Sequence, residues 1–324
     1  QAADQPGPYL SVSAGYLHTC GLKADGSVAC WGGNGYDHGQ ITVPAGMSAP
    51  GSAGFGQMAA GNAHACQVNR DGTLACWGNN DEGQATPPAG VFTQVVAGDS
   101  HSCAIGTNSK VTCWGRNGAM NTTQLASATG IWWQLAPGPN GAICALAFNR
   151  MSVLCVGGGW VSTDPFIARQ ITHNQDSGNA PVSCFVKADG SGRCTLSSFD
   201  AAHASYFGGP WQRLESGLNH QCGLKANGSI ECWGDNAQGQ TTGVPTGTMR
   251  ALSVGWNHAC AIKANGTLAC WGSNLNGQAT PPTGSYVQVA AGNTFTCAIR
   301  SDGVRVCWGD DGQGQAPQLA LSPS

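Results

Sequence analysis

The sequence predicts an all-β fold: a single β-propeller of eight blades, each of roughly 38–40 residues, with one hairpin disulfide per blade. Three observations carry this prediction. Sixteen cysteines form eight pairs, most pairs enclose a turn signal, and a repeat of about 40 residues runs through the chain. For β-rich units, a period of this length is typical of a propeller. Residues 1–324 are therefore expected to form one domain.

The repeat is measured from the first cysteine of each pair. Successive first cysteines are 46, 37, 41, 40, 38, 38 and 37 residues apart. Each unit begins with a short apolar strand, which is clearest at Tyr9–Gly15, Thr93–Gly98, Trp133–Gly138, Trp211–Gly217, Arg250–Gly255 and Val287–Gly292. A hairpin follows, and Cys-Trp-Gly then leads into an Asn-x-x-Gly-Gln turn and a proline-ended segment. We expect about four strands in each unit, which is one blade.

The spacing of the cysteines predicts the hairpins. Cys20 and Cys30 are ten residues apart, so the loop Ala24–Gly26 lies midway and places the cysteines opposite each other on antiparallel strands. Gly suits the left-handed last position of such a loop. The third unit has Ser109 there, and the fourth pair is eleven residues apart, so its turn around Asn149 must differ. Opposed cysteines can bridge, and the predicted disulfides are Cys20–Cys30, Cys66–Cys76, Cys103–Cys113, Cys144–Cys155, Cys184–Cys194, Cys222–Cys232, Cys260–Cys270 and Cys297–Cys307.

The cysteines also predict the compartment. A cytosolic protein rarely carries so many cysteines except as metal ligands, and the usual C-x2-4-C zinc spacing does not occur. We therefore expect a mature chain in a secreted, extracellular environment. Asn121, Asn227 and Asn265 begin glycosylation sequons. No apolar run approaches the roughly 20 residues of a membrane-spanning helix, so membrane insertion is not expected.

The balance of acidic and basic residues indicates which kinds of partner the chain can bind. Lys and Arg number 14 and Asp and Glu 17, which gives a formal net charge of −3. A nucleic-acid-binding protein normally has a basic face, so we expect no nucleic-acid partner. Charged residues make up only 10% of the chain, and the 11 Trp with an even spread of apolar residues argue against disorder.

The repeat resembles that of a known family. The pattern A-G-x-x-H-x-C-x-(L/I)-K-x-x-G-x-(V/L)-x-C-W-G-x-N-x-x-G-Q is similar to the repeat of the regulator of chromosome condensation, with cysteines added. The Gln-x-x-x-Pro linkers resemble those of the bacterial β-lactamase inhibitory propeller, and the cysteine pairs resemble the extracellular repeats of Crinkly-type plant receptor kinases. The resemblance covers almost the whole chain and implies a propeller. Relatives usually have seven blades, so seven blades plus an unusual eighth element is the alternative. Because functions in this family are scattered, the resemblance implies little about activity.

Two residue types recur at fixed positions and are expected to be structural. The histidines lie in five different blades, so they cannot converge on one metal ion; we expect them to be partly buried and expect no metal or cofactor. The tryptophans after the second cysteines are expected to pack between blades. The residues concerned are His18, His64, His101, His220 and His258, and Trp31, Trp77, Trp114, Trp233, Trp271 and Trp308.

Residues of about 140–210 depart from the repeat and gather polar side chains. Irregular loops on a rigid scaffold commonly carry function, although a blade that has drifted from the motif is the plain alternative. The candidate ligand-binding residues are Trp160, Arg169, His173, Asp200, His203 and Tyr206. The candidate catalytic residues are Asp164, Asp176, Asp200, His203 and His173. The sequence contains no nucleophile elbow, no His-Glu-x-x-His and no phosphate-binding loop, so nothing positive supports catalysis.

These observations predict a secreted protein that acts by binding. A lectin-like role with glycan ligands is the first hypothesis. The second is a protein partner or inhibition of a hydrolase, as in the inhibitory propeller that the chain resembles. The third is a polysaccharide-acting enzyme with its site near the irregular fourth and fifth blades. The sequence leaves the ligand and the oligomeric state open.

Overall fold

The structure is a computed structural model of the chain. It describes residues 8–33, 37–44, 57–116, 123, 125, 131–137, 142–147, 153–157, 160–164, 168–175, 181–195, 205–207, 209–312 and 316. Within these residues, no helix has the length and apolar character of a membrane span.

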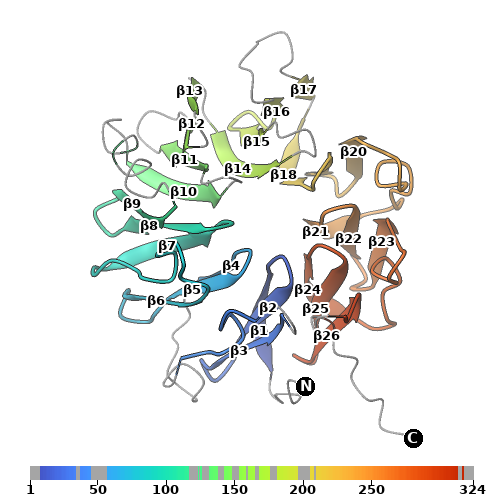
Figure 1. Cartoon of the computed structure of the whole chain (residues 1–324). Coiled ribbons are helices and arrows are strands. Elements are labelled where there is room, and N and C mark those ends of the chain that lie inside the picture. Colours follow the sequence, from blue (N-terminus) through green and yellow to red (C-terminus); the bar gives the residue numbers. More distant parts are fainter. Residues whose placement is uncertain are drawn as a thin grey trace, which may run out of the picture.

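Eight antiparallel sheets stand around a common centre (Figure 1). In each sheet the strands follow one another in sequence order, and the first strand lies nearest the centre. One disulfide lies in each sheet. The eight-bladed propeller is therefore confirmed, and the seven-bladed alternative is wrong.

Counted over the described residues, six of the sheets have three strands and two have four. The three-stranded sheets are β1 (Tyr9–Ala14), β2 (His18–Lys23), β3 (Val28–Gly32); β4 (Met58–Ala60), β5 (His64–Val68), β6 (Leu74–Gly78); β7 (Phe92–Ala97), β8 (His101–Gly106), β9 (Val111–Gly115); β18 (Trp211–Ser216), β19 (His220–Lys225), β20 (Ile230–Gly234); β21 (Met249–Val254), β22 (His258–Lys263), β23 (Leu268–Gly272); and β24 (Tyr286–Ala291), β25 (Phe295–Arg300), β26 (Arg305–Gly309). The four-stranded sheets are β10 (Trp132–Pro137), β11 (Ile143–Ala147), β12 (Val153–Gly157), β13 (Trp160–Asp164); and β14 (Ala168–Gln175), β15 (Pro181–Lys187), β16 (Gly192–Thr195), β17 (Ser205–Phe207).

Among the described residues, the six regular sheets have three strands each and lack the predicted fourth strand. After β6 the chain forms a turn in which Glu82 N donates to Gln84 Oε1 at 2.9 Å and Ala85 N donates to Asn80 Oδ1 at 2.9 Å. These side chains already satisfy backbone donors of the turn. The following Pro87 has no N–H with which to extend a ladder. A fourth strand is described in the two sheets that lack this turn, where β13 and β17 pair with β12 and β16.

The hairpins form as predicted. Cys20 lies opposite Cys30, Lys23 N donates to Ser27 O at 2.8 Å, and Gly26 has φ +83°. Ser109, which takes the glycine position in the third hairpin, also has a positive φ, of 60°. All eight predicted disulfides are present, with Cα–Cα distances of 3.9–4.1 Å. Each joins two strands of one sheet, so noncovalent contacts hold one sheet to the next.

The first strands also match the prediction to within one residue, and most begin with a bulge. The register shifts at the second residue, for example between Trp132 and Gln134 and between Tyr286 and Gln288. A bulge turns the extra side chain away from the ladder. Accordingly, Leu10, Trp133 and Val287 are exposed. They lie at the end of the ring that carries the loops between second and third strands, which is called the hairpin end below.

The first and last sheets contact each other, so packing contacts run around the whole ring. Gln288 in β24 holds the backbone of Val12 in β1: Val12 N donates to Gln288 Oε1 and Gln288 Nε2 donates to Val12 O, both at 3.3 Å. Tyr9 and Trp31 of the first sheet share a buried cluster with Ile299 of the eighth.

The tryptophans pack between sheets as expected. Trp77 Nε1 donates to Gln40 O of the preceding sheet at 3.0 Å, and Trp308 Nε1 donates to Gln278 O at 2.9 Å. Trp114 and Trp271 make the same bond. The carbonyl of each Gly-Gln turn is thus a fixed acceptor for the next sheet, which excludes these tryptophans as sugar-stacking residues.

Replacing Gln288 tests the contact between the first and last sheets. Gln288→Ala leaves a backbone donor and acceptor of Val12 without their partners, so we expect the free energy of unfolding to fall by about 1–3 kcal/mol. Urea unfolding of the disulfide-intact protein measures this change. Gln212→Ala is the matched control, because Gln212 is exposed; it should change stability by less than about 0.5 kcal/mol. Equal effects of the two substitutions would contradict the proposed role of Gln288.

Candidate binding site in the central pocket

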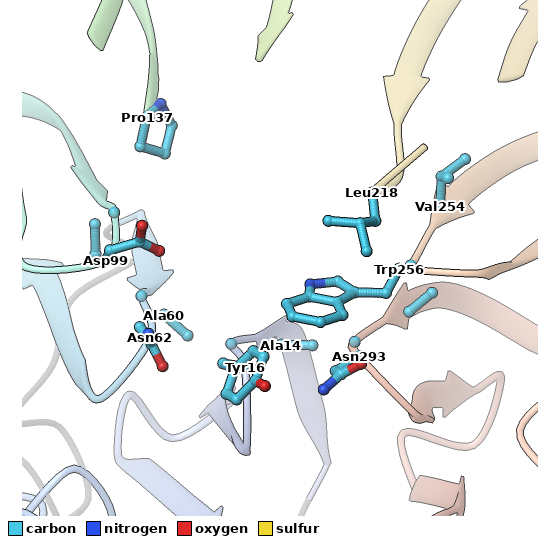
Figure 2. A pocket seen from close by; sticks show the side chains of 17 residues that line it. Ala14, Tyr16, Ala60, Asn62, Asp99, Pro137, Leu218, Val254, Trp256 and Asn293 are labelled. Carbon is cyan, nitrogen blue, oxygen red and sulfur yellow. The ribbon is translucent and has the colours of Figure 1, made fainter. Parts of the chain in front are cut away.

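A pocket lies at the centre of the ring, at the end where the turns between first and second strands meet (Figure 2). Its volume is about 230 Å³. Described residues of seven sheets line it. Small or apolar residues at the ends of the first strands form the wall: Ala14, Ala60, Ala97, Pro137, Val254 and Ala291. The residues that follow form the rim: Tyr16, Asn62, Asp99, Leu218, Trp256 and Asn293.

The rim residues share one place in the repeat, directly after the glycine of a Gly-x-x-His segment, or of Gly-x-x-Phe in the eighth sheet. A Cβ at Gly15 would lie 2.3 Å from Gly61 O, so glycine is what lets neighbouring turns approach this closely. The turns are also bonded to each other: Tyr16 N donates to Gly61 O at 3.3 Å, and Trp256 N donates to Gly292 O at 3.2 Å. A nearly constant backbone in six sheets therefore presents five different types of side chain to the pocket.

The rim combines aromatic rings with amides and a carboxylate. Tyr16 and Trp256 are half-buried, and their ring centroids lie 4.8 Å apart at an interplanar angle of 55°. Figure 2 shows these two rings together on one side of the pocket and Asp99 on another. Asn62 and Asp99 are exposed. Apolar faces beside a few polar groups are what small-ligand sites usually offer.

Sequence analysis did not single out the rim residues. The available signal was that the position after this glycine changes between units, whereas the glycine before it repeats. A position that varies on a repeated backbone is where a repeat protein can place ligand contacts.

The structure distributes the predicted site residues over several strands. Trp160 and Asp164 are the two ends of β13, the fourth strand of its sheet, and Tyr206 lies in β17, the fourth strand of the next sheet. Arg169 and His173 lie in β14, the first strand of that sheet. Asp176, Asp200 and His203 lie outside the described residues, so the predicted roles of this group stay predictions.

His173 has a strand position that corresponds to the pocket wall. In β14, Thr172 lies opposite Cys184 and His173 follows it. In β1, Ser13 lies opposite Cys20 and Ala14 follows it. By register, His173 therefore takes the place that Ala14 takes in the first sheet.

The five repeated histidines are structural, and they are more deeply buried than expected. Each has 0% of its surface exposed. His64 Nε2 lies 2.8 Å from Ser102 Oγ, and His258 Nε2 lies 2.8 Å from Thr296 Oγ1, each in the next sheet. Burial lowers the pKa to about 4 for His18, His101, His220 and His258, and to about 3 for His64. Among the described residues, no group of three His, Cys, Asp or Glu could hold a metal ion.

Two of the sequons lie at the hairpin end, away from the pocket. Asn227 and Asn265 are exposed in hairpin loops, where each Oδ1 accepts a hydrogen bond from a hydroxyl two residues later, at 2.8 Å. Asn121 lies outside the described residues. Modification at Asn227 or Asn265 would leave the pocket open.

The fold and the site define a disulfide-containing β-propeller with a central pocket. Five stretches match the family model described as the regulator of chromosome condensation (RCC1) repeat, at residues 10–40, 57–84, 92–119, 249–278 and 286–315. The eight-bladed propeller therefore contains RCC1-like repeats, as the repeat pattern implied. No curated protein matches the sequence.

Solved structures show the same fold at low sequence identity. The Crinkly ectodomain of the Arabidopsis thaliana receptor kinase ACR4 is 23% identical, with a TM-score of 0.57 over 94% of this chain and 98% of that one. The ectodomain of the Physcomitrella patens receptor kinase CR4 is 22% identical, with a TM-score of 0.57 over 94% and 74%. Prp20p of Saccharomyces cerevisiae is 17% identical, with a TM-score of 0.55 over 94% and 83%.

The buried histidines predict a loss of stability in mild acid. The folded protein keeps them neutral down to about pH 4, whereas a histidine in the unfolded chain takes up a proton near pH 6.5. Between these values the unfolded chain binds more protons, so stability falls as the pH falls from 6.5 to 4. Each unit of pKa difference contributes about 1.4 kcal/mol.

The melting temperature between pH 7 and pH 4 measures this effect. His64→Gln should flatten the dependence, because one titrating group is removed. His38→Gln should leave the slope unchanged, because His38 is exposed. A melting temperature that stays constant over this range would contradict the assignment of buried neutral histidines.

Proposed function

We propose that this chain is an extracellular binding propeller whose central pocket binds a glycan. The observation that carries the proposal is the Tyr16–Trp256 pair in the rim of the pocket, which also carries the amides of Asn62 and Asn293. Aromatic faces pack against the apolar faces of sugar rings. Amides both donate and accept hydrogen bonds, which suits sugar hydroxyls.

The size of the pocket favours a terminal sugar. Its volume of about 230 Å³ is smaller than the roughly 300–1,000 Å³ of sites that enclose drug-sized ligands. One sugar ring is therefore a better fit than an enclosed oligosaccharide, and the rest of a glycan would extend over the surface.

The pocket favours binding over catalysis. Glycoside hydrolysis generally needs two carboxyl groups that flank the scissile bond. Among the described residues that line the pocket, Asp99 is the one carboxylate. The described candidates of the irregular sheets are spread over three strands and supply no second carboxylate to this lining.

The extracellular setting rests on the disulfides. Eight disulfides and no free cysteine suit an oxidising compartment. The two plant neighbours are ectodomains of receptor kinases, which supports the same setting. We also propose that residues 1–324 form a single propeller domain.

A protein partner is the second candidate. A groove of about 680 Å³ adjoins the pocket, and it is open enough to take part of a protein surface. The yeast neighbour Prp20p is described with binding properties to Gsp1p and histones. Inhibition of a hydrolase would be one form of such binding.

A glycan array with three forms of the protein tests the proposal. Burying one aromatic side chain contributes about 1.5–3 kcal/mol, so Trp256→Ala should weaken binding by about tenfold or more. Trp133→Ala is the matched control, because Trp133 is exposed at the opposite end of the ring; it should bind like the unaltered protein.

Two results would overturn the proposal. If Trp133→Ala weakened binding as much as Trp256→Ala, the glycan site would lie elsewhere. If no glycan bound and the protein instead captured a partner whose binding was lost in Trp256→Ala, the pocket would be a protein-binding site.

A further inference from the structure

Basic side chains gather at the hairpin end of the ring together with the loop carboxylates Asp25, Asp71, Asp189 and Asp302, whereas the pocket end carries mainly carboxylates. A Lys or Arg lies at or beside the hairpin loop in seven sheets, as Lys110 and Lys263 do. Among the described residues the pocket end has Arg116 as its single Lys or Arg. The carboxylates at the pocket end are Asp37, Asp81, Glu82, Asp99, Asp235, Asp310 and Asp311. The small net charge of the chain conceals the excess of carboxylates at the pocket end, where an anionic ligand would meet like charge.

The groove beside the pocket continues this acidic lining. It shares Tyr16, Asn62 and Asp99 with the pocket, so the two cavities are continuous. Asp81, Glu82 and Asp310 also line the groove. Among the described residues, no Lys or Arg lines either cavity. A ligand that leaves the pocket along the groove therefore passes several carboxylates, one histidine (His38) and no Lys or Arg among the described residues.

In the rim of the pocket, both the aromatic rings and the carboxylate favour a positive charge. The faces of Tyr16 and Trp256 attract cations, and the carboxylate of Asp99 accepts charge-assisted hydrogen bonds. Figure 2 shows Asp99 on a different side of the pocket from the two rings. A sugar ring with a protonated amino group can thus place its apolar face on the rings and its ammonium near Asp99.

From this cavity we infer that the preferred glycan is an oligosaccharide of amino sugars with free, protonated amines. The inference rests on the proposed function and names the class of its ligand. The first ring occupies the pocket between Trp256 and Asp99, and the following rings lie along the groove beside Asp81 and Glu82. Neutral N-acetylated sugars lack the charge that this lining selects.

Two hexamers with the same backbone test the inference. The β-1,4-linked glucosamine hexamer carries amines, and the N-acetylglucosamine hexamer is its neutral counterpart. Calorimetry in mildly acidic buffer should show about tenfold tighter binding of the amine form at low salt. High salt should reduce this preference, because the carboxylates of the groove are exposed to solvent.

Asp99→Asn is the test variant, and it should remove most of the preference for the amine form. Asp302→Asn is the matched control, because Asp302 is exposed in a hairpin loop at the opposite end of the ring; it should keep the preference.

The outcomes separate this inference from the proposed function. Equal binding of the two hexamers, or a preference that survives in Asp99→Asn, overturns the amino-sugar inference and leaves glycan binding intact. Binding of other glycans but of neither hexamer also overturns the inference alone. If no glycan binds and a polylysine peptide does, both the amino-sugar inference and the proposed glycan-binding function are overturned. The acidic groove would then be a site for a basic protein segment.

Discussion

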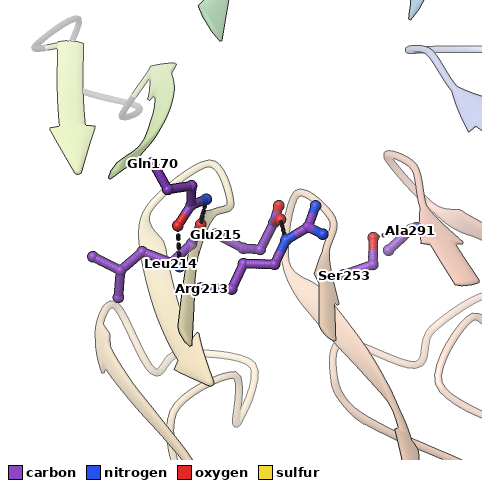
Figure 3. A network of polar contacts seen from close by, with 6 residues as sticks. All are labelled: Gln170, Arg213, Leu214, Glu215, Ser253 and Ala291. Atoms are coloured by element: carbon purple, nitrogen blue, oxygen red, sulfur yellow. Dashed lines mark hydrogen bonds and ion pairs between the residues drawn. The ribbon is translucent and has the colours of Figure 1, made fainter. Parts of the chain in front are cut away.

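Contacts between neighbouring sheets determine whether this ring exists, because every disulfide lies inside a single sheet. Glutamines on the first strands supply part of these contacts: Gln170 accepts from Leu214 N at 2.8 Å and donates to Leu214 O at 2.7 Å (Figure 3). The seventh sheet has Ala251 at the glutamine position, and there Ser253 Oγ accepts from Ala291 N at 3.0 Å instead. A single unit cannot bury its apolar faces alone. The central pocket depends on the same contacts, since seven sheets line it.

The repeat separates the residues that build the backbone from those that meet a ligand. Glycine and histidine fit together behind the pocket: a Cβ at Gly98 would lie 2.2 Å from His101 Cε1. Each buried glycine–histidine pair fixes the turn in which it lies. In several turns the backbone N–H after the glycine also donates to a carbonyl of the next turn, as Tyr16 N does to Gly61 O. The side chain after the glycine is then free to differ, as Tyr16, Asp99 and Trp256 show. The chemistry of the pocket can therefore change without disturbing the ring.

Local spacing explains what the sequence could predict. The ten-residue separation of Cys20 and Cys30 and the glycine in the loop determine the hairpin and its disulfide together. The fourth strand could not be predicted in this way, because hydrogen bonds such as that from Glu82 N to Gln84 Oε1 favour a turn over a ladder. The pocket could not be predicted either, since its residues are single positions in sheets far apart in the chain. Composition also hides the excess of carboxylates at the pocket end, because that excess depends on the end of the sheet where each residue lies.

Hydrogen exchange of the disulfide-intact protein, with and without a bound glycan, tests most directly that the central pocket is the binding site. The account predicts slower amide exchange in the turns that carry Tyr16, Asn62 and Trp256, with no change in the hairpin loops. Protection confined to the hairpin loops, or to the irregular sheets of residues 160–207, would contradict it.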